Sequence, residues 1–512
     1  MPGFSSVGEL AVGELRPDLV TPSNEETFFF SNVGFTSGPD DTPANTYFAP
    51  RILRSLRFAR SIVGSEGFGG RGVVNVGSAV LQGGDRGLDF LATGYDASMR
   101  GIEFRLGARR IPNQPDFAYD DFRCIFRGLI AGWAGGSKEL RLRLRDLTGR
   151  LVEPVAQNRY TASDGPDLAG KPIPIALGSV FNVPLVAVDR ANNVWQGHDG
   201  AWRKMRGFRA VRDRGKELDK VVGVPAIGEY SEDVDAGTVT LGGTPAGVLT
   251  ADIDGAEIDG AFPNTVGDIA RAICRDLLNM PDADLALDTF EGLAKNVTAP
   301  VGIWTGLDDV LAIDLIEQLM VGIGGFVIGS AMGQVAVGEF APPNPSPSFT
   351  LDHTQIWDVE RVDPPAAVDP ALSSVRMGWG RNYRPLTETE MDPSDLTDDE
   401  RQALSQEFRE VVRTDTARKI AIAGARETAL IPTAFADAGN TEFFADRRLD
   451  LYDGERAPFR FKTGLVGFGL DINVSGFVTH PEFAELKAGR ALRIYAHDPN
   501  PDNGVVTVEA YG

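Results

Sequence analysis

The stretch from Glu139 to Arg145 constrains the fold most, because it alternates leucines with charged side chains residue by residue. A period of two places Leu140, Leu142 and Leu144 on one face of a β-strand, whereas helical spacing would spread them around an axis. The preceding run, residues 122–133, is joined to it by Ala134-Gly-Gly-Ser, a connection suited to a β-hairpin. Short runs of this kind recur between turn-forming pairs drawn from 59 glycines and 32 prolines. The sequence therefore predicts an α+β fold that is predominantly β.

The chain has 512 residues, which is too long for one ordinary hydrophobic core, since domains usually hold roughly 100 to 200 residues. We expect a multidomain architecture of β-barrel or β-sandwich domains with a smaller helix-containing α/β domain. The order of strand and helix signals predicts an N-terminal β-domain over 1–157, a second β-domain over 158–262, a helix-plus-hairpin domain over 263–345, and a C-terminal β-rich domain with an acidic helical insertion over 346–512.

Two segments near the middle of the chain carry helical patterns. Residues 265–278 place their apolar side chains on one stripe, and Thr265 stands three residues before Asp268, the separation of a capping box. A second, densely apolar helix is predicted to begin near Thr305 and to end at the glycines of 322–325. Both helices are expected to pack on a core.

A third helix is predicted in an acidic segment. Between Glu388 and Glu410 the chain carries nine acidic residues and two arginines, and Thr397 and Glu400 again have capping-box spacing. We interpret this acidic segment as an exposed loop that enters a surface helix.

Three further segments predict strands or their connections. A hairpin is expected over 326–340, and Lys171-Pro-Ile-Pro predicts an edge or a domain-entry strap, because proline cannot pair in a central strand. At the C-terminal end, a strand over 492–495, a turn over 497–504 and a strand over 505–511 are expected.

Charge and cysteine content limit the classes of partner and compartment. The net charge of −22 opposes attraction to nucleic acid and to anionic membranes, both of which need basic surfaces. Cys124 and Cys274 are far apart in sequence and are expected to be free, buried thiols made in a reducing cytoplasm. The N-terminus lacks the pattern of a signal peptide, and no run approaches the roughly 20 apolar residues of a membrane span. We expect no stable membrane insertion.

The sequence contains only weak matches to motifs of cofactor-binding or metal-binding sites. Residues 67–72 match GxGxxG, but Val73, Val74 and Val76 follow as in a strand, so we interpret a glycine-rich turn or interface loop and not a dinucleotide site. The aspartates Asp252, Asp254 and Asp259 indicate a hairpin with acidic turns more than a calcium loop. The four histidines have no metal-ligand spacing and are expected in loops or at strand edges: His198, His353, His480 and His497.

No nucleophile elbow or P-loop occurs, and the many carboxylates single out no pair, although glycosidase-type carboxylates stay open. We therefore expect no enzyme activity, with no catalytic, cofactor-binding or metal-ligating residue and no cofactor.

One basic cluster, Arg203–Lys220, stands out in this acidic chain, with eight lysines or arginines against three acids. Two interpretations are open. The cluster is a solvated loop face, which we favour somewhat, or a docking patch for an acidic surface of a neighbouring subunit.

Several short motifs share one character, in that they consist of glycines, prolines and strand ends. They are Phe48-Ala-Pro-Arg-Ile-Leu, Gly67-Phe-Gly-Gly-Arg-Gly, Asn75-Val-Gly, Gly87-Leu-Asp, Gly94-Tyr-Asp, Arg143-Leu-Arg-Asp, Asn158-Arg-Tyr, Gly170-Lys-Pro-Ile-Pro, Leu311 to Val337, Val478-Thr-His-Pro, Ala488-Gly-Arg and Thr507-Val-Glu-Ala-Tyr-Gly. Together they resemble the siphophage and prophage tail-tip, or baseplate, hub-type family, which is related to the central hub of phage baseplates. At two loop tips, Gln82-Gly-Gly-Asp-Arg-Gly and Asp96-Ala-Ser depart from the family's pattern.

The resemblance implies a virion structural protein that forms a ring around the tail axis, most simply a homotrimer, and links the tail tube to distal fibres. The implied partners are a tube or distal tail protein, the tape measure protein, and fibre or receptor-binding proteins, without sequence-specific nucleic-acid binding. The implied location is the phage tail, assembled in the bacterial host cytoplasm. Alternatives are a tail-tip protein with cell-wall hydrolase activity, a distal-tail ring, and an adhesin.

Overall fold

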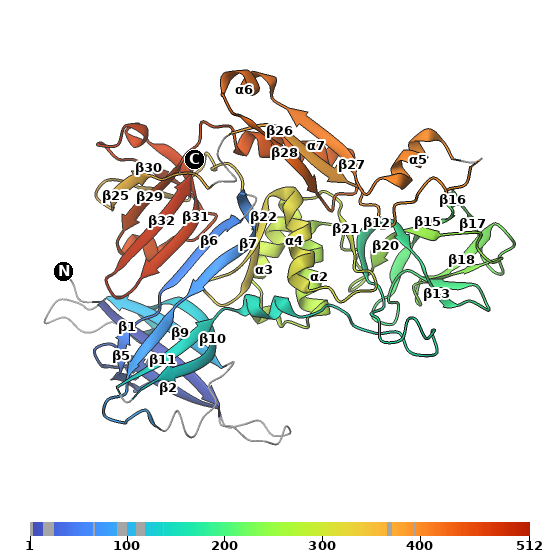
Figure 1. The fold of residues 1–512 in the computed structure, drawn as a ribbon. Helices are drawn as coiled ribbons and strands as arrows, with labels where there is room; N and C mark the ends of the chain where they lie inside the picture. Colours follow the sequence, from blue (N-terminus) through green and yellow to red (C-terminus); the bar gives the residue numbers. More distant parts are fainter. Residues whose placement is uncertain are drawn as a thin grey trace.

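The computed structural model of the chain describes residues 4–13, 25–64, 67–89, 100–108, 118–136, 138–365, 371–393 and 396–512. The fold is α+β and mainly β, as predicted, with several sheets and few helices. Figure 1 shows two β-rich ends projecting from a central body that contains the helices of residues 266–323. Among the described helices, none is long and apolar enough to cross a membrane.

The first sheet contains the predicted hairpin, in which Leu142 and Leu144 are buried while Arg141 and Arg143 are exposed. Its core includes Phe104, Phe126 and Ile130 from neighbouring strands. In sheet order the nine strands are β3 (Phe35–Thr36), β4 (Tyr47–Pro50), β2 (Glu25–Ser31), β1 (Phe4–Gly13), β9 (Gly101–Ala108), β10 (Arg123–Gly135), β11 (Glu139–Arg145), β8 (Ser78–Gln82) and β5 (Ile52–Arg54).

A ten-stranded sheet unites residues from the beginning, middle and end of the chain. The sequence of its main path is β23 (Val335–Glu339), β22 (Gly325–Gly329), β7 (Gly67–Val76), β6 (Phe58–Gly64), β31 (Arg490–Asn500), β32 (Val505–Tyr511), β29 (Pro458–Thr463) and β25 (Ile356–Arg361), and β24 (Phe349–Leu351) and β30 (Ser475–Val478) branch from it. The predicted hairpin over 326–340 is confirmed as β22–β23. Since this sheet draws on distant segments, the domain boundaries at 157, 262 and 345 stay a prediction.

The strand before the C-terminal turn is longer than predicted. β31 continues to Asn500, and residues 496–500 pair with 505–509, so the expected turn over 497–504 shrinks to 501–504. Pro499 is tolerated in this strand, where it lies opposite Val506. In β32 the side chains of Val506, Val508 and Ala510 share a buried face, as predicted.

The second β-rich part consists of two five-stranded sheets over one core. The strap is confirmed, because Pro172 makes only an isolated bridge, to Arg159, before the first strand begins. One of these two sheets has the order β16 (Lys216–Glu217), β15 (Met205–Asp213), β20 (Leu249–Ala256), β12 (Ala176–Pro184) and β21 (Gly302–Trp304). The other has the order β13 (Val186–Asp189), β14 (Val194–Gln196), β19 (Thr238–Leu241), β18 (Glu229–Asp233) and β17 (Asp219–Lys220).

The bounds of the central helices agree with the sequence prediction for the first predicted helix and differ from it for the second. α2 (Val266–Ala272) continues through a π-helical turn, Ile273–Leu277, and the hydroxyl of Thr265 accepts from the backbone N–H of Asp268, which confirms the predicted cap. The expected start near Thr305 is wrong, since α4 spans Ala312–Ile323. The delay has a physical cause: Val310 accepts from the N–H of Val155, and Leu311 bridges Pro154, so both are extended. A further helix, α3 (Leu287–Asn296), was not predicted.

The C-terminal part adds a three-stranded sheet, ordered β27 (Arg409–Thr414), β26 (Leu372–Trp379) and β28 (Arg426–Pro432), which contacts α7 (Ala438–Leu451). α5 (Asp398–Ser405) has the predicted capping box of Thr397 and Glu400, and α6 (Thr416–Ala421) links two strands. Short 3-10 turns occur at Tyr119–Asp121, Leu147–Val152, Asp282–Asp284, Leu465–Gly469 and Ala484–Leu486.

Candidate functional site

The glycine motif at 67–72 lies inside β7 and not in a turn, which corrects the sequence interpretation. A Cβ on Gly69 would lie 2.7 Å from the carbonyl oxygen of Gly325, and a Cβ on Gly72 would overlap Ile328. The glycines therefore allow β22 to approach β7 closely in parallel pairing. The strand continues to Val76 without a helix, so the motif has a packing role.

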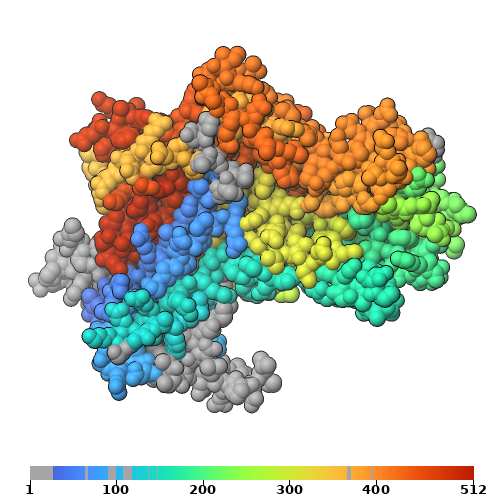
Figure 2. All heavy atoms as spheres, viewed as in Figure 1, coloured from blue at the N-terminus to red at the C-terminus, as the bar shows by residue number. Residues whose placement is uncertain are grey.

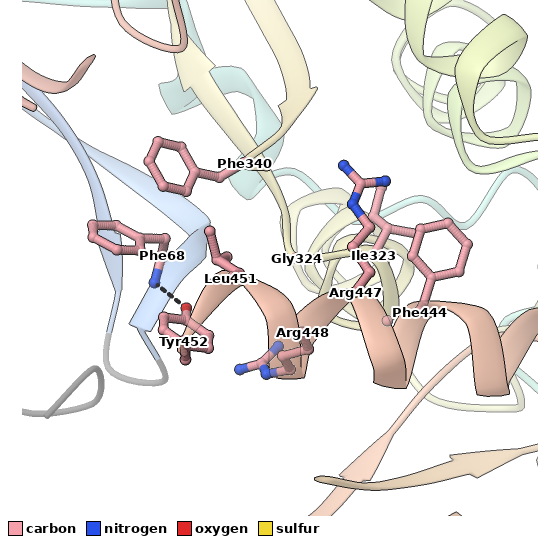
Figure 3. A pocket seen from close by; sticks show the side chains of 10 residues that line it. Phe68, Ile323, Gly324, Phe340, Phe444, Arg447, Arg448, Leu451 and Tyr452 are labelled. Atoms are coloured by element: carbon pink, nitrogen blue, oxygen red, sulfur yellow. Dashed lines mark hydrogen bonds between the residues drawn. The ribbon is translucent and has the colours of Figure 1, made fainter. Parts of the chain in front are cut away.

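Phe68 in this motif lies at the junction of three segments, shown in Figure 3. Its backbone N–H donates to the hydroxyl of Tyr452 at 3.0 Å, and its ring lies 4.5 Å from that of Phe340. The cavity at this junction measures about 10 Å³. Such a space holds one water at most, so it is a packing defect between α4, α7 and the sheet.

The three aspartates are separated by their arginine partners. Asp252 and Asp254 lie in β20, which corrects the interpretation of acidic hairpin turns. Asp252 accepts hydrogen bonds from both Nη atoms of Arg212, at 2.7 and 2.8 Å. Asp254 pairs with Arg209 at 3.1 Å. Asp259 lies in a turn and pairs with Arg275. Within the described ranges, no group of histidines, cysteines and carboxylates could hold a metal ion.

His198, His353 and His480 lie in loops, as expected, whereas His497 lies inside a strand, which corrects the expectation for that residue. Two of the four, His198 and His497, are buried. The Nδ1 atom of His198 accepts from the N–H of Ala176 at 3.1 Å, and its Nε2 is 2.9 Å from the carbonyl oxygen of Arg203. His497 lies in β31, with Nε2 at 3.0 Å from the carbonyl oxygen of Gly467. Burial lowers the pKa of each to about 4, so both are neutral at pH 7. Two ring nitrogens bound to backbone make His198 a structural residue.

Both cysteines are free, as predicted, and Cys274 is buried, but Cys124 is only half-buried, which corrects the expectation for that thiol. Burial raises the pKa of Cys124 to about 11 and that of Cys274 to about 12. Neither thiol has the lowered pKa of a nucleophile.

The basic cluster Arg203–Lys220 lies mostly in the strands β15, β16 and β17, so it is not a loop. Six of its eight lysines and arginines are exposed, as expected for a solvated face. Its charges are compensated by carboxylates of the same chain: Arg203 pairs with Asp276, Lys204 with Glu257, Arg209 with Asp254, Arg212 with Asp252, and Lys220 with Glu232. Docking on a neighbouring subunit stays a prediction, with little uncompensated charge in the cluster to drive it.

The acidic segment 388–410 packs on this second β-rich part. Arg214 donates to the carbonyl oxygen of Met391 at 2.8 Å, and Asp392 donates its N–H to the carbonyl oxygen of Arg214 at 2.8 Å. Met391 and Leu404 share a small buried cluster, and a Cβ on Gly215 would meet Leu404. The segment is thus exposed on one side, as predicted, and anchored on the other.

The most unusual surface is the apolar loop of residues 221–228, which connects β17 and β18. Val222, Val224 and Ile227 are almost completely exposed, Val224 to 98% and Ile227 to 90%. Large apolar side chains are rarely exposed together unless another molecule covers them. The sequence signal is the run Val-Val-Gly-Val-Pro-Ala-Ile, which sequence reasoning did not single out.

The backbone of the apolar loop is fixed although its side chains are free. The Glu229 carboxylate accepts from the N–H of Ala226 at 2.8 Å, and Val221 donates to the carbonyl oxygen of Tyr230 at 2.9 Å. A Cβ on Gly242 would lie 1.9 Å from the carbonyl oxygen of Ala226, so a glycine just after β19 lets the loop pack closely against it. A fixed loop loses little entropy on binding. In Figures 1 and 2 this part lies at the end of the molecule remote from the N-terminal sheet.

Comparisons with known proteins give loose likenesses only. No family model matches the chain, and no curated protein matches it. Solved structures that resemble it include a tail protein from Neisseria meningitidis MC58, with 11% identity, a TM-score of 0.41 and coverage of 100% of this chain and 97% of that one. A chain from the virion of a native gene transfer agent particle has 13% identity, a TM-score of 0.41 and coverage of 67% and 84%. The 43 kDa tail protein of prophage MuSo2 from Shewanella oneidensis has 9% identity, a TM-score of 0.32 and coverage of 91% and 96%. Likenesses this loose carry no argument about what the chain does.

Proposed function

We propose that the chain is a non-enzymatic structural subunit of a phage-type tail, a tail-tip hub that forms a trimeric ring around the tail axis. The observation that supports an assembled state is the apolar loop 221–228, whose backbone is fixed while Val222, Val224 and Ile227 face solvent. Three exposed large apolar side chains on one ordered loop are characteristic of a contact that is buried in a complex. The identity of the complex rests on the resemblance of the sequence motifs to those of tail-tip hubs.

The location and partners follow from the same proposal. The subunit is assembled in the host cytoplasm into the tail of the virion, where it contacts a tube or distal tail protein, the tape measure protein and the fibre or receptor-binding proteins. Ring closure would also cover sheet edges, such as that of β27, that otherwise invite uncontrolled pairing.

The loop provides the test. A variant with Val222→Ser, Val224→Ser and Ile227→Ser removes the apolar contact without touching the core, because these side chains are almost fully exposed. In particles complemented with this variant, we expect incorporation of the chain to fall at least tenfold, while the urea unfolding midpoint stays that of the wild type. Ile420→Ser, an exposed apolar residue on α6, is the control and should incorporate normally. Normal incorporation of the loop variant would refute this role of the loop.

A further inference from the structure

A second cavity, which measures about 220 Å³, lies between the second β-rich part and the C-terminal part. Its walls are residues of β12, β15, β20 and β21 on one side and, on the other, the connection from β26 to β27, the start of β27 and the residues that follow β28. Their relative positions are fixed, because Phe181 bridges Asn382 and Val301 bridges Phe435. The cavity therefore has firm walls and room for several waters.

Arg409 reaches this cavity without a partner of its own. Its guanidinium carbon lies 4.5 Å from the ring centroid of Phe181 and 4.6 Å from that of Trp379, so the group is sandwiched between two aromatic rings. Among the residues that the structure describes, no side chain forms an ion pair or a hydrogen bond with this guanidinium, and its Nε is buried. Burial lowers the pKa of Arg409, yet an arginine stays charged.

The carboxylates around the cavity are already used by other arginines. Arg381 pairs with Glu407 at 3.3 Å, and Arg209 pairs with Asp254 at 3.1 Å.

The charged groups that act on Arg409 are Asp252 and Arg212, which form a bidentate pair with each other. Asp252 therefore lines the cavity with its charge compensated. Arg409 is therefore the one arginine among these four that has no carboxylate partner in the described part of the chain.

We propose that this cavity binds a small oxyanion of the phosphate class, with Arg409 as its main ligand and Arg381 and Arg209 beside it. The flat guanidinium presents a fork of N–H donors that matches two oxygens of such an anion. A half-buried cation without a counterion is unfavourable, and an anion would remove that penalty. The net charge of −22 repels anions from the surface in general, so saturable binding requires a local site of this kind.

The site would also connect two parts of the fold. Arg209 belongs to β15 of the second β-rich part, whereas Arg381 and Arg409 flank the strands of the C-terminal three-stranded sheet. A bound anion would hold these parts together. This inference does not depend on the proposed tail function.

Calorimetric titration of the full chain with inorganic phosphate, at constant ionic strength, tests the proposal. We expect saturable binding by the wild type and at least a tenfold loss of affinity in Arg409→Gln. Arg413→Gln is the matched control, since Arg413 lies on the same strand but is exposed and paired with Asp446 at 2.8 Å, and it should bind like the wild type.

Two further measurements decide the remaining outcomes. If Arg409→Gln does not fold, Arg409→Lys keeps the charge but loses the fork, and it should bind phosphate at least threefold more weakly. Titration with acetate should give much weaker binding than phosphate, and equal affinity would overturn the choice of anion class. Absence of binding by the wild type, or equal loss in Arg409→Gln and Arg413→Gln, would overturn the site itself.

Discussion

Single side chains show how strongly tertiary context decides their chemistry. His198 is enclosed with both ring nitrogens bound to backbone groups. Because Nδ1 accepts from the N–H of Ala176, the ring proton is on Nε2 and donates to the carbonyl oxygen of Arg203. A second proton on Nδ1 would point at the N–H of Ala176, and the two donors would repel each other. The fold therefore selects the neutral ring.

This burial predicts a pH dependence of stability. The pKa of His198 falls from 6.5 to about 4 on folding, so the unfolded chain takes up a proton first, and stability is lost as pH falls from 6.5 through 4. His198→Gln removes this term, so the decrease in unfolding free energy between about pH 7 and about pH 4.5 should shrink by about 2 kcal/mol. Urea unfolding of both proteins at the two pH values measures the difference. An unchanged decrease would show that His198 does not titrate in this way.

The two thiols should be slow to react in the folded chain. With a pKa of about 11 for Cys124 and about 12 for Cys274, the thiolate is present at no more than about one part in a thousand near pH 8. Titration with a chromogenic disulfide reagent should detect both thiols in denaturant and no rapidly reacting thiol under native conditions. A fast native thiol, or fewer than two after unfolding, would count against the free, shielded state.

At the scale of elements, the contact between β7 and β22 depends on glycine at one position more than at its neighbour. Gly69 and Gly70 both have positive φ, +115° and +78°, but a Cβ added at Gly69 would lie within 3 Å of backbone, whereas one added at Gly70 would meet open space. Strain in φ and steric overlap can therefore be separated by two adjacent substitutions.

Gly69→Ala should lower the free energy of unfolding by about 3 kcal/mol, because it adds overlap with Gly325 to the φ strain. Gly70→Ala should cost about 1 kcal/mol, since only the φ strain applies. Thermal and urea unfolding of the two variants provide the comparison. Equal effects would mean that close strand approach is not what requires glycine at position 69.

Elements whose signals are local could be predicted from sequence. The β10–β11 hairpin depends on a period of two and a glycine turn, and the cap of α5 depends on Thr397 and Glu400. The start of α4 could not be predicted, because Val310 and Leu311 are held extended by residues near 154. The burial of His198, the exposure of the apolar loop and the surplus charge of Arg409 likewise depend on residues that are distant in sequence.

At the scale of the whole molecule, the ten-stranded sheet binds the beginning of the chain to its end. Arg60 pairs with Asp471 at 2.7 Å, Ser55 donates to Asp502, and Ser61 lies opposite Ala496. The central body is therefore one connected core, and the second β-rich part carries the apolar loop at the far end. A subunit of this form offers a firm base and a separate contact surface, which suits a ring of identical copies.

The proposed role as a tail-tip hub is tested most directly by the number and arrangement of copies in an assembled tail. A cryo-electron microscopy map of particles that contain this chain should show three copies, related by a threefold axis along the tail, with the loop 221–228 buried in a contact. Six copies would favour a distal-tail ring instead. A single asymmetric copy, or particles without the chain, would contradict the hub proposal.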